Sequence, residues 1–71
     1  MTAHIFFKSS SRVAKVHGVT VIRKYGINAQ VKDVADCKDF VLEPTSKYTF
    51  IGDEIASFEG SEILYVEFFN R

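Results

Sequence analysis

Residues 47–69 show the clearest alternation of apolar and polar positions in the chain, in the segment KYTFIGDEIASFEGSEILYVEFF. Turn residues at Gly52-Asp53 and at Glu59-Gly60-Ser61 divide it into three predicted strands. The last strand, Ile63 to Phe69, is rich in the β-branched and aromatic types that favour strands. Both of its faces are largely apolar. We therefore expect the first half of the chain, a second copy or a partner to cover one of them.

The turn at Gly52-Asp53 predicts a register for the first hairpin of this segment. A two-residue turn with positive φ at Gly52 would place Ile51 opposite Glu54. It would also pair Phe50 with Ile55, Thr49 with Ala56 and Tyr48 with Ser57. Along the last strand, alternation predicts one inward set and one outward set. The inward set is Leu64, Val66 and Phe68, and the outward set is Ile63, Tyr65, Glu67 and Phe69.

The first half of the chain also favours strands over helix. A strand is predicted over residues 3–8, a turn at residues 9–11 and a second strand over residues 12–17. A helix over residues 12–25 is the alternative, but its apolar residues recur every third position and drift around a helix instead of forming one stripe. Gly18 and the many β-branched side chains oppose a helix further.

The two halves resemble each other. RVAKVHGVTVIRKY, starting at Arg12, aligns with EIASFEGSEILYVE, starting at Glu54, with Gly18 over Gly60. The chain thus indicates two pseudo-repeated units of three strands. Between them, residues 28–40 fit a strand, a loop or a short helix, and Phe40-Val41-Leu42 predicts a short strand before a turn at residues 44–46. We predict one all-β domain over residues 1–71, a small antiparallel barrel or sandwich of five or six strands.

Length and cysteine content limit how this domain is stabilised. At 71 residues the core is small, and the single cysteine, Cys37, excludes a disulfide within the chain. Self-association therefore becomes a plausible source of stability, and we expect a homodimer. A lone cysteine favours a reducing, cytoplasmic setting, and the sequence contains neither a signal peptide nor a membrane-spanning run.

Charge is divided sharply along the chain although the net charge is zero. Residues 1–32 contain six lysines and arginines and no acid, whereas residues 33–71 contain nine acids and three bases. One interpretation is a single-stranded nucleic-acid surface that combines cations with a stacking ring. Its residues would be Arg12, Lys15, Arg23, Lys24 and Tyr25. The alternative is that strands of opposite charge pair within one sheet and neutralise each other.

No motif points to catalysis or to a metal. His4, His17 and Cys37 do not fall at a usual ligand spacing, and the acids at positions 33, 36 and 39 lack the glycine and closing glutamate of a calcium loop. Phosphate-binding loops and nucleophile motifs are also absent from the sequence. We predict a chain without enzymatic activity, metal, cofactor or small-molecule substrate.

The favoured function is therefore a small protein-binding module, an adaptor or an inhibitor of a host or defence protein. Its size and style are those of the accessory proteins that phages and mobile elements encode. The predicted binding residues lie on the second apolar face of the last strand, because Tyr favours interfaces and the domain has few elements left to cover that face. They are Ile63, Tyr65 and Phe69. The alternative function is nucleic-acid binding through the basic first half.

Overall fold

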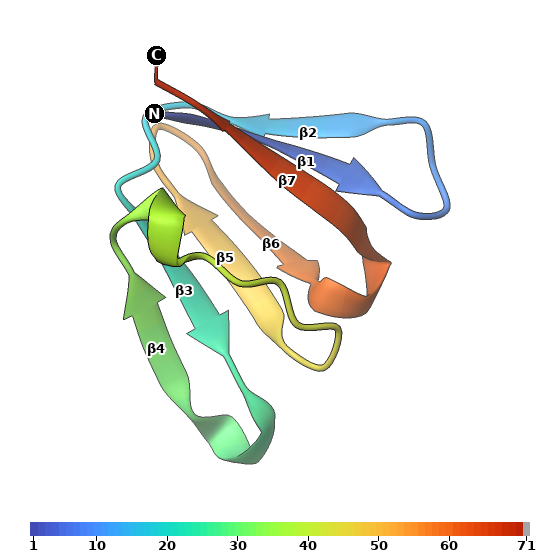
Figure 1. The fold of residues 1–71 in the computed structure, drawn as a ribbon, viewed down its shortest axis with the longest axis vertical. Coiled ribbons are helices and arrows are strands. Elements are labelled where there is room, and N and C mark those ends of the chain that lie inside the picture. Colours follow the sequence, from blue (N-terminus) through green and yellow to red (C-terminus); the bar gives the residue numbers. More distant parts are fainter. Residues whose placement is uncertain (71) are drawn as a thin grey trace.

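The computed structural model describes residues 1–70 and contains seven antiparallel strands in two sheets (Figure 1). The strands are β1 (Thr2–Phe7), β2 (Val13–Val16), β3 (Val21–Tyr25), β4 (Val31–Val34), β5 (Lys47–Ile51), β6 (Ile55–Glu59) and β7 (Ile63–Phe69). Three short 3-10 helices lie between them: η1 (Ile27–Ala29), η2 (Cys37–Asp39) and η3 (Gly60–Glu62). The all-β prediction is confirmed. The predicted count of five or six strands was too low and no closed barrel forms, while Arg71 lies outside the described residues.

The strand order is β2–β1–β7 in one sheet and β4–β3–β5–β6 in the other. The hairpin β1–β2 lies in the first sheet, and the next strand, β3, crosses to the second sheet. The hairpin β5–β6 lies in the second sheet, and β7 crosses to the first, beside β1. This is the connectivity of two three-stranded units that exchange their third strands, with β4 as an additional edge strand. The exchange brings both ends of the chain to one side of the molecule (Figure 1).

The core lies between the two sheets. From the first sheet, Ala3 and Ile5 are fully buried, and from the second sheet Tyr48 and Phe50 are fully buried. Full burial of a side chain such as Phe50 stabilises the fold by about 2–3 kcal/mol. Four further apolar residues complete the buried cluster: Val16, Val19, Ile22 and Ile63.

The register of the β5–β6 hairpin differs from the predicted one by a residue. Ile51 lies opposite Ile55, so the loop has three residues, Gly52, Asp53 and Glu54. The positive φ predicted for Gly52 was also wrong, because among the described glycines only Gly18 has one. As a result the inward pairs are Phe50 with Ala56 and Tyr48 with Phe58, and the outward pairs are Ile51 with Ile55 and Thr49 with Ser57.

The loop is shaped by a contact with the β2–β3 connection. The Asp53 amide donates to the His17 carbonyl oxygen at 2.7 Å. A Cβ at Gly52 would lie 2.3 Å from that oxygen, closer than a Cβ atom approaches a non-bonded oxygen. Glycine is therefore required at this position for close backbone packing and not for its φ. In the sequence, a glycine needed for close packing looks the same as a glycine needed for a positive φ.

A bulge in β7 changes which of its side chains face the core. Phe6 of β1 lies opposite Tyr65, whereas the next residue, Phe7, lies opposite Ile63, so Leu64 is the extra residue. An extra residue reverses the alternation beyond it. Ile63 is therefore buried at 1% exposure, while Leu64 is 54% exposed. The predicted places of these two residues were wrong, while Val66 and Phe68 do pack against the core as predicted.

The middle of the chain contains one strand and then an irregular crossing segment. Residues 31–34 form β4 and residues 37–39 form η2, whereas the predicted strand Phe40-Val41-Leu42 does not form. The buried Tyr48 hydroxyl donates to the Val41 carbonyl at 3.0 Å and accepts from the Glu43 amide at 2.6 Å. The Tyr48 hydroxyl thus forms hydrogen bonds with backbone groups that a neighbouring strand would otherwise bind. Phe40 extends over the core, and its ring contacts the rings of Tyr48, Phe50 and Phe68.

Candidate protein-interaction surface

The outer face of the β2–β1–β7 sheet carries a group of aromatic side chains. Ala3 and Ile5 of β1 point into the core, so His4 and Phe6 between them point outward. The registers of β1 with β2 and with β7 then identify the other residues of this face, because directly opposite residues share a face. We call this group the outer aromatic face, and its residues are His4, Phe6, Val13, Lys15, Tyr65, Glu67 and Phe69.

Two ring contacts connect β1 to β7 across this face. Phe6 and Tyr65 stack with ring centroids 4.4 Å apart and planes 14° apart. His4 and Phe69 pack with centroids 4.5 Å apart and planes tilted by 50°. Such aromatic pairs add about 0.5–1.5 kcal/mol beyond the area that they bury. They also hold the rings in fixed positions, although Tyr65 and Phe69 remain 45% and 42% exposed.

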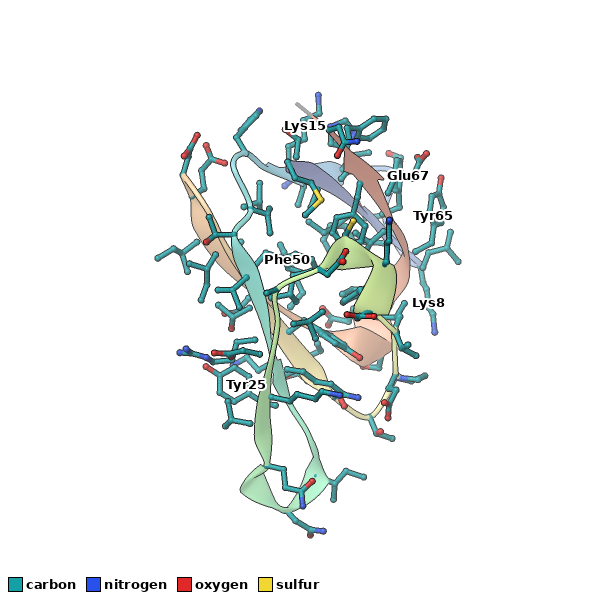
Figure 2. The ribbon with its side chains drawn as sticks, turned by 60° about the vertical axis from the view of Figure 1, so that its left-hand side comes forward. Lys8, Lys15, Tyr25, Phe50, Tyr65 and Glu67 are labelled. Carbon is teal, nitrogen blue, oxygen red and sulfur yellow. The ribbon has the colours of Figure 1, made fainter. Side chains whose placement is uncertain are left out.

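Charged groups accompany the rings. His4 lies between Lys15 on β2 and Glu67 on β7 in the two registers. Figure 2 shows Lys15, Glu67 and Tyr65 along the outer side of this sheet, with Phe50 inside between the sheets. The face thus combines fixed aromatic rings with one lysine and one glutamate. Aromatic side chains bordered by polar groups are typical of protein interfaces.

The structure brings two of the three predicted protein-binding residues onto this face. Tyr65 and Phe69 lie on it and are exposed, as expected for the second face of the last strand. Ile63 does not belong to it, because the bulge at Leu64 turns Ile63 into the core. The sequence-based prediction did not include Phe6 and His4 in this face. Their alternation is visible in the sequence, but the adjacency of β1 and β7 is not.

The predicted nucleic-acid residues do not form one surface. Lys15 lies on the outer aromatic face, while Arg12 is in the β1–β2 loop. Arg23 and Tyr25 are on the outer face of the other sheet, and Lys24 between them points the opposite way. Figure 2 shows Tyr25 and Lys15 on different sides of the molecule. Sequence proximity placed these residues together, whereas the exchange of strands between the sheets separates them.

Acids neutralise two of those cations. Arg23 binds Asp33 through Nε at 2.9 Å and Nη2 at 3.3 Å, and this contact lowers the pKa of the Asp33 carboxyl. Lys24 binds Glu43, and that hydrogen bond raises the pKa of Lys24, which keeps it charged. Both of these ion pairs join the basic first half to the acidic second half. Opposite charges pair between neighbouring strands of one sheet, as in the alternative interpretation of the charge division, at Arg23 of β3 and Asp33 of β4.

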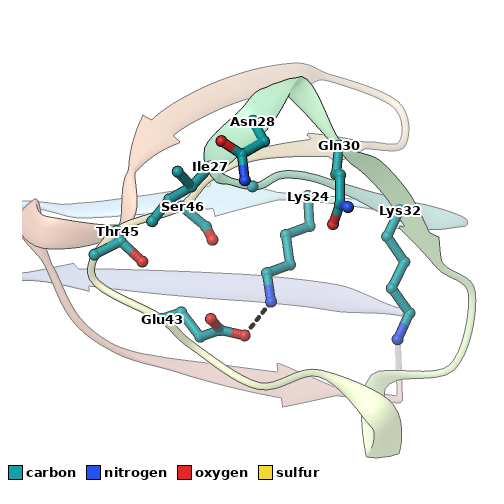
Figure 3. Close-up of a pocket in the computed structure, with 9 residues that line it drawn as sticks. Lys24, Ile27, Asn28, Gln30, Lys32, Glu43, Thr45 and Ser46 are labelled. Atoms are coloured by element: carbon teal, nitrogen blue, oxygen red, sulfur yellow. Dashed lines mark hydrogen bonds and ion pairs between the residues drawn. The ribbon is translucent and has the colours of Figure 1, made fainter.

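The Lys24–Glu43 pair forms one wall of an open pocket of about 420 Å³ at the β3–β4 turn (Figure 3). Lys32 and Gln30 also contribute to its lining. Because Lys24 already forms an ion pair with Glu43, the pocket does not offer a concentrated positive charge to an anion.

Residues 1–70 contain no cluster of three or more His, Cys, Asp or Glu side chains placed to hold a metal ion. Across the same residues, none of the helices has the length and apolar character that a membrane crossing requires.

Comparisons with known proteins do not assign this chain to a group: no family model, no curated protein and no solved structure matches it.

Proposed function

We propose that this protein is a non-catalytic protein-binding module whose outer aromatic face contacts another protein. The observation that supports the proposal is the pair of ring contacts between β1 and β7, Phe6–Tyr65 and His4–Phe69, on a sheet face that remains exposed. Rigid aromatic rings contribute large contact areas at low entropic cost, and Tyr residues often dominate binding energy. In the role of adaptor or inhibitor, the module would act by occupying a surface of its partner.

Capture of partners by matched variants tests this proposal. Tagged wild-type protein, Tyr65→Glu and Ile55→Glu are used to capture proteins from the cells that make this chain. Ile55 is the matched control, because it is an exposed apolar residue on β6 of the other sheet and receives the same charge. We expect wild type and Ile55→Glu to capture the same proteins in similar amounts. Tyr65→Glu should capture at least about tenfold less of them, since a buried interfacial charge costs several kcal/mol.

Nuclease treatment distinguishes the proposal from nucleic-acid binding. Protein capture should survive the nuclease, and a labelled single strand at low salt should not bind at micromolar protein. If the captured proteins disappear on nuclease treatment, nucleic-acid binding replaces the proposal. If the Tyr65→Glu variant captures the same proteins as wild type, the outer aromatic face is not the binding site.

A further inference from the structure

The second edge of β7 is open. Within residues 1–70, β1 is the one strand that pairs with β7. An open edge presents a row of backbone donors and acceptors that can pair with another chain. Natural proteins protect such edges with short strands, lysines, proline or β-bulges. β2 and β4 fit that rule, because each has four residues and carries a lysine, Lys15 or Lys32.

β7 has one of these protections, the bulge at Leu64, which lies at the beginning of the strand and leaves Tyr65 to Phe69 regular. With seven residues it is the longest described strand, and its only charged residue is Glu67. It contains neither proline nor glycine nor lysine. Leu64, the bulged residue, is more than half exposed on this strand, as is expected of a surface that another chain covers.

We propose that the β7 edge pairs with β7 of a second copy, antiparallel about a two-fold axis at Val66. The inference rests on the proposed function, because β7 supplies both the outer aromatic face and this edge. Side-chain chemistry selects the register. Centring the axis on Val66 places Glu67 opposite Tyr65 of the second copy, where the hydroxyl can donate to the carboxylate. Ile63 and Leu64 lie outside the regular ladder, because the bulge turns Ile63 toward the core.

Neighbouring registers are less favourable. In the dimer both outer faces lie on the same side of the sheet. The two-fold axis therefore passes beside one residue of β7, which lies opposite its own copy in the second chain. An axis at Glu67 would oppose two glutamates, and like charges directly opposite each other are destabilising. An axis at Tyr65 would place Glu67 opposite Ile63, which the bulge turns into the core. Val66 is therefore the centre that gives Glu67 a hydrogen-bond donor from the second copy.

The resulting assembly closes after two copies. Pairing β7 with β7 produces one six-stranded sheet whose new edges are the two β2 strands. These edges are short and carry Lys15, so further strand addition is opposed. The two outer aromatic faces become one continuous surface, which a partner protein would contact across both copies.

Sedimentation of the wild-type protein gives the first test. We expect a species of twice 8.1 kDa at tens of micromolar protein. A monomer at 100 µM would overturn the inference. A monomer whose capture of other proteins still depends on Tyr65 would leave the proposed function intact, whereas a dimer that captures nothing would support the pairing and count against that function.

Disulfide trapping tests the register in a Cys37→Ser background, which removes the native thiol. Directly opposite residues have Cβ atoms about 5 Å apart, within reach of a disulfide after small shifts. A mixture of Tyr65→Cys and Glu67→Cys chains should therefore cross-link. Either variant alone should cross-link at least tenfold more slowly, because its own copies would lie about 8 Å apart.

An Ile55→Cys chain, exposed on the other sheet, measures the rate of random collision. A mixture that links no faster than this control would contradict the pairing. Fast linking by Glu67→Cys alone or by Tyr65→Cys alone would contradict the register centred on Val66.

Discussion

The backbone of Gly52 lies against the carbonyl of His17, so close that a Cβ would come within 2.3 Å of that oxygen. The contact joins the loop after β5, which connects the first two strands of the second unit, to the loop after β2, which connects the last two strands of the first. Glu54 strengthens the junction, because its carboxylate accepts the His17 amide at 2.7 Å and contacts the ring Nδ1 at 3.0 Å. The two hairpins are thereby connected through polar groups as well as through the apolar core.

Gly52→Ala is expected to destabilise the protein by about 2 kcal/mol or more, because the added methyl group has no space unless the backbone moves. Gly26→Ala is the matched control: its Cβ would meet nothing closer than 3.7 Å. Urea unfolding of both variants checks the expectation. Equal midpoints for the two variants would show that the loop adapts without loss.

Acid should weaken the junction through Glu54. The hydrogen bond from the His17 backbone amide, followed by the contact with the His17 ring, lowers the pKa of Glu54 below its ordinary value of 4.5. A pKa lowered by folding contributes stability that is present above the ordinary value and is lost as pH falls through the lowered one. We therefore expect the unfolding midpoint of wild type to fall more steeply below about pH 4.5 than that of Glu54→Gln. Parallel pH profiles for the two proteins would contradict this role.

Tyr48→Phe should loosen the segment that crosses the core. The variant removes a buried hydroxyl that bonds to the Val41 carbonyl and the Glu43 amide, and leaving those groups without a partner costs roughly 1–3 kcal/mol. In a domain of this size the melting temperature should fall by about 5–15 °C. Hydrogen exchange supplies the specific measurement, since the Glu43 amide should lose its protection while the core amide of Phe50 keeps more. Unchanged exchange at Glu43 would show that another group replaces the hydroxyl.

Glutamate substitutions at Tyr65 and Ile63 should differ sharply in how much they destabilise the fold, although both residues are in β7. Tyr65→Glu should melt within a few degrees of wild type, because the side chain is on the surface. Ile63→Glu should unfold the protein, since a charge without a partner at a site that is 1% exposed costs several kcal/mol. Circular dichroism during heating checks both. A folded Ile63→Glu variant would mean that the bulge at Leu64 is absent in solution.

The sequence by itself determined the class of this fold and the position of most strands. Alternation and β-branched content depend on neighbours in the chain, so they placed strands at the positions of β1, β2 and β5–β7 and excluded a helix over residues 12–25. The same alternation placed Tyr65 and Phe69 together in the outward set of the last strand.

Tertiary structure decided what depends on distant groups. The bulge at Leu64 follows from the pairing of β7 with β1, more than fifty residues away, and it moves Ile63 from the surface to the core. The loop at Gly52 follows from contact with His17, and the irregular segment after Phe40 follows from the Tyr48 hydroxyl. Strand exchange between the sheets separates Lys15 from Arg23. The physical reason is common to all of these: the free energy of a register or a bulge lies in contacts across the sheet, and alternation along one strand carries no information about the partner strand.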